Sequence, residues 1–155
     1  MIRVSGTLCP IEDDVAVREI YPLMAQLRSH LTDADMFIAY WRRQSEVGYR
    51  LIALHSEGQA VALAGYRVQE NLVYGRFLYV DDLITDADRR SQGYGERIIQ
   101  HLRSEAKKMG CAKLVLDTPM SNSLGHRFYF RCGLLATSLR FSIPVESWNG
   151  SSVSL

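Results

Sequence analysis

The segment Arg90-Ser91-Gln92-Gly93-Tyr94-Gly95 joins a stretch rich in β-forming residues, which ends at Thr85, to a stretch with helical periodicity. Between Tyr94 and Met109 the apolar residues recur at i, i+3 and i+4 offsets, and Gly110 is placed to end that helix. A glycine-rich turn at the start of a helix presents main-chain N–H groups and the positive end of the helix dipole to an anion. The segment therefore predicts a phosphate site to which Arg90 adds a side-chain charge, although such glycines also occur in plain turns.

The glycine spacing excludes two common phosphate-binding motifs. A P-loop ends in Gly-Lys followed by Ser or Thr, and the dinucleotide-binding fingerprint needs three spaced glycines. Neither pattern occurs around Gly93 and Gly95.

Upstream of this segment, the sequence predicts two helices followed by a hairpin. Acidic residues lead into a helix over Ile11–Leu31, whose apolar residues keep helical spacing, and a second short helix is expected over Asp33–Arg43. The stretches Tyr49–His55 and Ala60–Val68 predict two antiparallel strands that turn at Glu57-Gly58-Gln59.

The rest of the chain alternates strands with helices. Tyr74–Thr85 predicts one further strand or two, and Lys113–Asp117 predicts a short buried strand. Asn122 can cap a helix that Gly133 ends, and Leu139–Pro144 predicts a last strand. This order of elements is typical of an α+β fold or a mixed α/β sheet.

The composition describes one globular domain. With 155 residues, of which 47% are hydrophobic and 23% charged, the chain is long enough for a single core and too apolar to be disordered. We expect one domain over residues 1–148 and a disordered polar tail over residues 149–155.

Charge and apolar runs argue against several classes of function. A net charge of +1 gives no overall attraction to nucleic acid or to an anionic membrane. The longest apolar runs, such as Ala60–Tyr66, fall far short of the roughly twenty residues that cross a bilayer. The N-terminus shows no secretory signal pattern, so a cytoplasmic protein is expected. Cys9, Cys111 and Cys132 and the histidines lack disulfide or metal spacing, so we expect reduced thiols and no metal.

Three ordered motifs lie in the second half of the chain. Arg90–Gly95 fits the pattern (Arg/Gln)-x-x-Gly-x-(Gly/Ala), Val80–Thr85 forms the strand before it, and Asn122–Leu134 contains His-Arg-Phe-Tyr-x-Arg-x-Gly. In this order they resemble the GNAT superfamily of acyl-CoA-dependent N-acetyltransferases. The resemblance is close over Leu78–Pro144, whereas the first half agrees only in the order of its elements.

The resemblance implies an α+β, GNAT-like fold. Its centre is a mostly antiparallel mixed sheet of six to seven strands, flanked by about four helices. This sequence departs from the family pattern at Ala87, Gly125 and Leu134, where proline, alanine and phenylalanine are common. None of these departures removes a group with catalytic chemistry.

The resemblance also implies acetyl-CoA as the cosubstrate. The main chain of Leu83, Ile84 and Thr85 would pair with the pantetheine arm as an added strand. The main-chain N–H groups of the turn and first helical residues would hold the pyrophosphate, with Arg90 nearby: Gln92, Gly93, Tyr94, Gly95 and Glu96. Asn122 matches a cofactor-side asparagine, and it fits a helix N-cap equally well.

Transfer of an acetyl group to an amine needs a base and a group that protonates the departing sulfur. Tyr129 matches the acid of the family, although the aromatic run around it also suits core packing. Asp81 and Asp82 alternate along the strand, so only one of them is expected to face the substrate side. We place Asp82 first as the base and Asp81 second, and an acid in this strand equally suits a structural partner for the following loop.

The acceptor site of this fold is built by the first helices and the hairpin loops, where no motif appears. The aromatic and arginine side chains there suit a small amine that carries an anionic group, or they are core aromatics and solvated surface: Tyr40, Trp41, Arg42, Arg43, Tyr66, Arg67 and Tyr74.

The function that the resemblance implies is transfer of acetyl from acetyl-CoA to a primary amine, by direct attack in a ternary complex. A small-molecule amine is the expected acceptor, with no nucleic acid or membrane partner, and a homodimer stays open. The alternatives are a protein-lysine acetyltransferase and a catalytically silent CoA-binding or regulatory module of the same fold.

Overall fold

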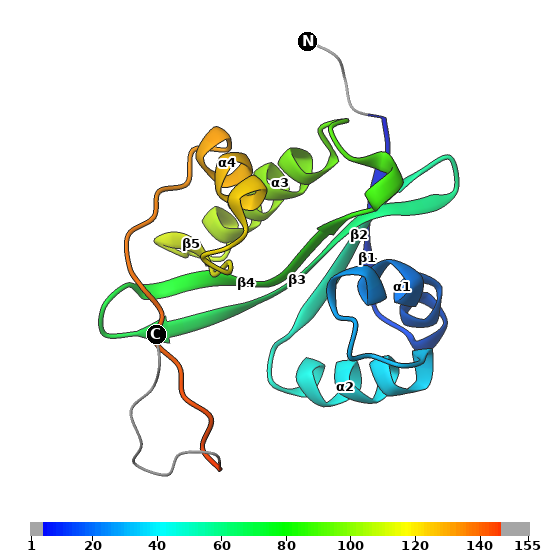
Figure 1. The fold of residues 1–155 in the computed structure, drawn as a ribbon, viewed down its shortest axis with the longest axis horizontal. Helices are drawn as coiled ribbons and strands as arrows, with labels where there is room; N and C mark the ends of the chain where they lie inside the picture. The colour runs from blue at the N-terminus through cyan, green and yellow to red at the C-terminus, as the bar shows by residue number, and fades with distance from the viewer. Residues whose placement is uncertain (1–4, 147–155) are drawn as a thin grey trace. The chain divides into compact units, whose positions relative to one another are not determined.

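The computed structural model describes residues 5–146, so the tail expected over 149–155 lies outside the described residues. The chain forms two compact units, one that extends to Leu116 and one that begins at Asp117. The first unit holds the sheet and the helices that cover it (Figure 1).

Five strands form one sheet in the described residues, in the order β1-β2-β3-β4-β5. They are β1 (Thr7–Ile11), β2 (Arg50–Ser56), β3 (Gln59–Asn71), β4 (Gly75–Thr85) and β5 (Lys113–Leu116). The first four form an antiparallel meander, and β5 runs parallel to β4. The predicted hairpin is confirmed as β2–β3, and β4 is a single strand.

The helices α1 (Asp14–Leu27) and α2 (Ala34–Glu46) begin at aspartate caps. The carboxylates of Asp13 and Asp33 accept the main-chain N–H groups of Ala16 and Met36, each at 2.8 Å. Such a cap stabilises a helix by about 1 kcal/mol. The helix predicted over Ile11–Leu31 is confirmed only over Asp14–Leu27, because Ile11 belongs to β1 and the helix ends before Arg28. None of the helices described between residues 5 and 146 has the length and apolar run needed to cross a bilayer.

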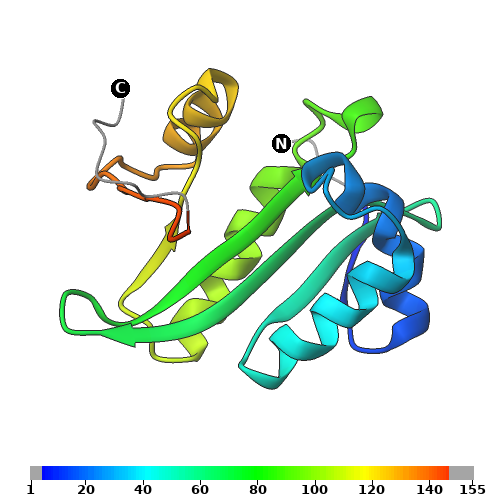
Figure 2. The same cartoon turned by 60° about the horizontal axis from the view of Figure 1, so that its bottom comes forward.

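The sheet is covered on both faces. Figures 1 and 2 show α1 and α2 on one face and α3 (Tyr94–Lys108) on the other. Leu63 and Ile84 are buried with residues of α1 and α2, whereas Leu78 and Val80 are buried with residues of α3. The helix predicted after the Gly-rich turn is confirmed as α3.

A β-bulge in β4 changes the face to which its side chains point. Gly65 pairs with Asp82 while the next residue of β3, Tyr66, pairs with Val80, so Asp81 is an extra residue in β4. Val80 then packs on the α3 side and Ile84 on the α1/α2 side, although both have even numbers. Side chains alternate in a regular strand, so this change of face follows from the one inserted residue.

β4 also loses one of its two neighbours halfway along. It pairs with β5 only over Phe77–Val80, whereas its pairing with β3 continues to Thr85. Within the described residues, the part of β4 after Val80 therefore has no strand on the β5 side.

The second unit contains α4 (Ser123–Arg131). As predicted, Asn122 caps this helix, and its Oδ1 accepts the Gly125 N–H at 3.1 Å. The strand predicted over Leu139–Pro144 is wrong, because these described residues belong to no sheet. The sheet thus has five strands instead of six to seven, since β propensity alone does not supply the hydrogen-bonding neighbour that a strand needs.

Candidate active site

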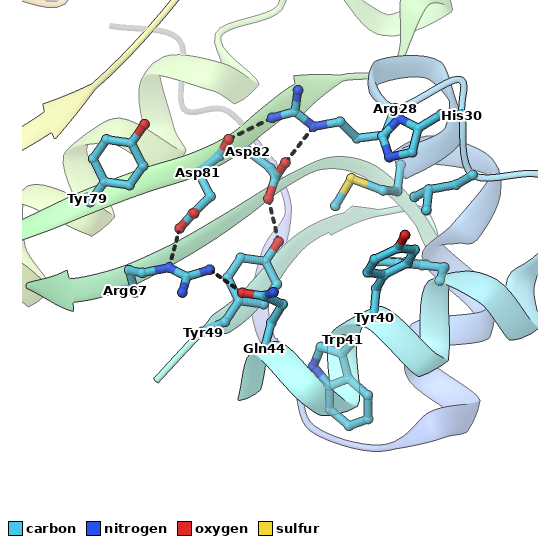
Figure 3. Close-up of a pocket in the computed structure, with 13 residues that line it drawn as sticks. Arg28, His30, Tyr40, Trp41, Gln44, Tyr49, Arg67, Tyr79, Asp81 and Asp82 are labelled. Atoms are coloured by element: carbon cyan, nitrogen blue, oxygen red, sulfur yellow. Dashed lines mark hydrogen bonds and ion pairs between the residues drawn. The ribbon is translucent and has the colours of Figure 1, made fainter. Parts of the chain in front are cut away.

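A pocket of about 380 Å³ opens on the α1/α2 face of the sheet, beside the bulge in β4 (Figure 3). A volume in this range suits a small molecule. Aromatic side chains form much of its lining: Phe37, Tyr40, Trp41, Tyr49 and Tyr79. We call this the acceptor pocket.

Four charged side chains reach the acceptor pocket from different elements. Arg28 is the C-cap residue that follows α1, Arg67 lies on β3, and Asp81 and Asp82 follow each other on β4. Both aspartates line the same pocket (Figure 3), so the prediction that they face opposite sides of the sheet is wrong. The bulge at Asp81 is the reason, because it interrupts the alternation of side chains.

Asp82 is held by two donors. Its Oδ1 accepts a hydrogen bond from Arg28 Nε at 2.8 Å, and its Oδ2 accepts one from the Tyr49 hydroxyl at 2.5 Å. Burial and the nearby Asp82 carboxylate raise the pKa of Tyr49 well above its ordinary value, so this hydroxyl stays a donor. The Asp82 side chain is only 13% exposed, and both of its oxygens have protein partners.

Tyr49 reaches Asp82 because Gly65 has no side chain. A Cβ at Gly65 would overlap the Tyr49 hydroxyl and ring. The sequence did not indicate Tyr49 and Arg28 as site residues, because no motif marks either. The one signal for Tyr49 was a glycine inside a strand, which often marks a close approach of another group.

Asp81 has a different environment. Its Oδ2 accepts a hydrogen bond from Arg67 Nε at 3.1 Å, while Arg67 Nη2 donates to Gln44 Oε1 at 2.8 Å. Burial raises the pKa of Asp81 above its ordinary value, and the hydrogen bond and charge of Arg67 oppose that rise. Among the described residues, no hydrogen bond reaches the other carboxylate oxygen, Oδ1. Asp81 therefore keeps one oxygen available for a bound molecule.

After Val80, β4 has no strand neighbour on its β5 side among the described residues, and we call this its free side. The free side of β4 exposes main-chain groups directly after the two aspartates. The Asp86 N–H donates to the Val61 carbonyl on β3 at 2.8 Å. Main-chain groups alternate between the two sides of an antiparallel strand, so Leu83 and Thr85 turn theirs away from β3. Ile84, the middle residue of the three expected to hold the cofactor, turns its main chain toward β3.

The turn before α3 has the backbone of an anion-binding loop. Ser91 and Gly93 have positive φ angles of 62° and 83°, and Gly93 is the N-cap residue of α3 with no side-chain cap. The first N–H groups of α3, from Tyr94, Gly95 and Glu96, are thus uncapped by a side chain.

Side chains around this turn differ in their roles. The Tyr94 ring is 5% exposed and accepts a hydrogen bond from Arg89 at 3.2 Å, which anchors the turn to the core. The side chains of Arg90, Gln92 and Glu96 are exposed, so Arg90 is accessible to an anion.

In the second unit, Asn122 is the N-cap of α4 and also donates to Thr118 Oγ1 at 3.1 Å. A Cβ at Gly125 would overlap the Asn122 amide, which explains the departure from the common alanine. Tyr129 packs edge-to-face with Phe128, with ring centroids 5.3 Å apart. Burial raises the pKa of Tyr129 above its ordinary value, so its hydroxyl is protonated at neutral pH.

Of the residues expected to form the acceptor site, Tyr40, Trp41 and Arg67 line the acceptor pocket. The other four have contacts elsewhere. Arg42 pairs with Asp14, and Arg43 lies over the Tyr40 ring at 4.7 Å from its centroid. Tyr66 packs with the α3-side core, and Tyr74 packs against Phe77 at 5.5 Å between centroids.

Comparison with known proteins gives consistent results. Residues 15–134 match the model of the Acetyltransferase (GNAT) family. The chain is 31% identical to the N-acetyltransferase YhdJ of Bacillus subtilis over 132 residues, which cover 82% of this chain and 90% of that protein. It is 24% identical to the glucosamine 6-phosphate N-acetyltransferase of Arabidopsis thaliana over 94 residues, 59% of this chain and 61% of the relative.

Solved structures share the fold. The crystal structure of that Arabidopsis thaliana enzyme superposes with a TM-score of 0.72 at 20% identity, covering 91% of this chain and 99% of the other. The aminoglycoside acetyltransferase AAC(6')-Iy, solved with a CoA-containing bisubstrate analogue, gives a TM-score of 0.78 at 12% identity, covering 90% and 97%.

Proposed function

The chain belongs to the acetyltransferase (GNAT) family and is an acyl-CoA-dependent N-acetyltransferase, and from this premise we propose that its acceptor is the primary amine of a small molecule. The amine attacks acetyl-CoA directly while both are bound. One observation carries the proposal: Asp81, inside the acceptor pocket, stands two residues before Leu83, whose main chain faces the free side of β4.

Acetyl-CoA, the cosubstrate of this family, supplies the acetyl group as an activated thioester. The residues of this chain fit it. Leu83 and Thr85 offer N–H and C=O groups that an amide-bearing arm can pair with, as an added strand would. The uncapped N-terminus of α3 offers donors to a pyrophosphate, with Arg90 beside it.

Asp81 is the base in this proposal, in place of Asp82, which we placed first from the sequence. Both oxygens of Asp82 are engaged by Arg28 and Tyr49, whereas Asp81 keeps Oδ1 available. Its raised pKa also makes Asp81 a better proton acceptor than an ordinary carboxylate. Asp82 positions Arg28 and Tyr49 around the pocket.

Tyr129 acts as the acid. Asp81 takes one proton from the ammonium, the nitrogen forms the C–N bond as the C–S bond breaks, and Tyr129 donates a proton to the departing sulfur. The nitrogen loses its second proton as the amide forms, and this proton restores Tyr129, while Asp81 releases its proton to water. The raised pKa of Tyr129 keeps the hydroxyl protonated until sulfur carries charge.

Residues with proposed roles occur in both compact units. Asp81 and the Gly-rich turn lie in the first unit, and Asn122 and Tyr129 lie in the second. We therefore propose that residues 1–148 act as one catalytic domain, in which Asn122 contributes to the cofactor side.

A small-molecule acceptor is favoured over a protein lysine by the size of the acceptor pocket, about 380 Å³, and by relatives that are named for glucosamine 6-phosphate. A silent CoA-binding module needs no base, and the available Asp81 oxygen in the pocket argues against it.

Two measurements, made one after the other, test the proposal. Acetyl-CoA at about a hundred times its dissociation constant should stabilise the protein by roughly 2.7 kcal/mol, which raises the melting temperature by about 5–11 °C. A nicotinamide dinucleotide of similar charge is the control. Amines should then release free thiol from acetyl-CoA, and Tyr129→Phe should lower kcat without changing the thermal shift. A full shift without amine-dependent thiol release would favour the silent module.

A further inference from the structure

The charged side chains of the acceptor pocket neutralise one another. Arg28 Nε bonds to Asp82 Oδ1 at 2.8 Å, and Arg67 Nε bonds to Asp81 Oδ2 at 3.1 Å (Figure 3). The pocket thus contains two cations and two anions in two ion pairs. His30, an exposed residue, also lines the pocket.

Further donors of both arginines are also engaged. Arg28 Nη2 donates to the Asp81 carbonyl at 2.8 Å, and Arg67 Nη2 donates to Gln44 Oε1 at 2.8 Å. Recognition of phosphate or carboxylate normally uses an arginine fork that can turn toward the ligand. Neither arginine can do this without leaving Asp81 or Asp82 as an unpaired, partly buried charge.

The Asp81 carboxylate also places a negative charge next to the bound amine. An amine that gives its proton to Asp81 Oδ1 has its neighbouring atoms close to the Asp81 carboxylate. An α-carboxylate on the same carbon as that amine would lie beside Asp81 and be repelled. An amine without such a group brings only a cation, which the carboxylate attracts.

The rest of the lining is apolar and aromatic. Phe37, Tyr40 and Trp41 come from α2, and Tyr79 comes from β4. Aromatic faces bind an apolar body by burial and attract an ammonium by cation–π contact. Arg43 lies over the Tyr40 ring but does not line the pocket, so it adds no cation inside.

From these contacts we infer that the acceptor is a primary amine on an apolar or aromatic body, without phosphate or carboxylate. This inference rests on the proposed function, because it names the substrate class of the same site. This acceptor differs from the amine with an anionic group that we expected from the arginines in the sequence. It also separates this chain from the relatives named for glucosamine 6-phosphate.

Two matched substrate pairs test the inference with the purified full chain and acetyl-CoA. The first pair is 2-phenylethylamine and phenylalanine, which differ by the α-carboxylate. The kcat/KM for 2-phenylethylamine should be higher by about tenfold or more, because a second carboxylate would be placed beside Asp81. The second pair is glucosamine and glucosamine 6-phosphate, for which the phosphate should give no increase in kcat/KM.

Two variants test the physical cause. Asp82→Asn removes the charge that neutralises Arg28. The ratio of kcat/KM for 2-phenylethylamine to kcat/KM for phenylalanine should therefore fall by roughly threefold to tenfold. Tyr40→Ala should raise KM for 2-phenylethylamine by a larger factor than KM for glucosamine. Tyr74→Ala, an aromatic truncation outside the pocket, is the matched control and should change neither KM.

The outcomes separate this inference from the proposed function. A preference for glucosamine 6-phosphate or phenylalanine would overturn the inference while the N-acetyltransfer to a small amine stands. If no amine in the panel releases thiol although acetyl-CoA raises the melting temperature, the proposed small-molecule function itself fails, and the inference fails with it.

Discussion

Asp81 and Asp82 are consecutive residues of β4, yet both carboxylates line one pocket and each holds a different arginine. The bulge opposite Gly65 and Tyr66 makes this arrangement possible. The two acids have different environments, because both oxygens of Asp82 accept hydrogen bonds from protein groups whereas Asp81 keeps one oxygen available.

Replacing each aspartate by asparagine should separate these roles. Asp81→Asn removes the base and should lower kcat by about 10²–10⁴, with little change in the binding of acetyl-CoA. Asp82→Asn leaves Arg28 without a carboxylate and should lower the unfolding free energy by about 1–3 kcal/mol. Steady-state kinetics and thermal melts of both variants give the comparison. A larger loss of kcat in Asp82→Asn than in Asp81→Asn would return the base to Asp82.

The pH dependence of kcat/KM should report Asp81. Burial raises its pKa above the ordinary value of 3.8, and only the deprotonated carboxylate accepts a proton, so activity should rise with pH through that raised pKa and then level off. Arg67 lowers the pKa of Asp81, so Arg67→Gln should move the rise to higher pH. An unchanged acid limb in Asp81→Asn would show that another group titrates.

The glycine at the head of α3 should matter for the cofactor more than for the fold. Gly93 and Gly110 both have positive φ, 83° and 71°, so alanine should destabilise the protein by about 1 kcal/mol at either position. Only Gly93→Ala places a Cβ in the turn expected to hold the pyrophosphate, so only this variant should raise the KM for acetyl-CoA. Equal KM values in the two variants would remove the turn from the cofactor site.

A side chain at Gly65 should disturb the pocket from within the sheet. The Cβ of Gly65→Ala would overlap the Tyr49 ring and hydroxyl, so Tyr49 must move away from Asp82. We expect a loss of about 1–3 kcal/mol in unfolding free energy and a higher KM for the amine. Gly58→Ala, at a turn glycine with no atom within 4 Å of its Cβ position, is the control for the amine KM. A Gly65→Ala protein with wild-type stability would contradict this packing.

The sequence predicted the elements whose signals are local. Asp13 and Asp33 mark the starts of α1 and α2, and Gly58 marks the β2–β3 turn. The strand β1 was missed because it is short and contains Pro10, which removes one ladder donor and suits an edge position. Leu139–Pro144 has strand-forming residues, but a strand also depends on a neighbour that propensity does not reveal.

The site was predictable only where a motif lies in one continuous segment. The turn from Arg90 to Gly95 has the uncapped helix start that its glycines predict. The acceptor pocket instead depends on Arg28, Tyr49 and the bulge at Asp81, which come from distant parts of the chain. A bulge is decided by the register between two strands, so the residues of β4 alone did not indicate it.

The central claim, direct attack of an amine next to Asp81 on acetyl-CoA, is tested most directly by initial velocities with both substrates varied. Thiol release should be measured with wild-type protein and Asp81→Asn across acetyl-CoA and 2-phenylethylamine concentrations. Our account predicts intersecting double-reciprocal lines, acetylated amine in equal amount to free thiol, and a large loss of kcat in Asp81→Asn. Parallel lines with an acetylated protein intermediate, or full activity in Asp81→Asn, would contradict it.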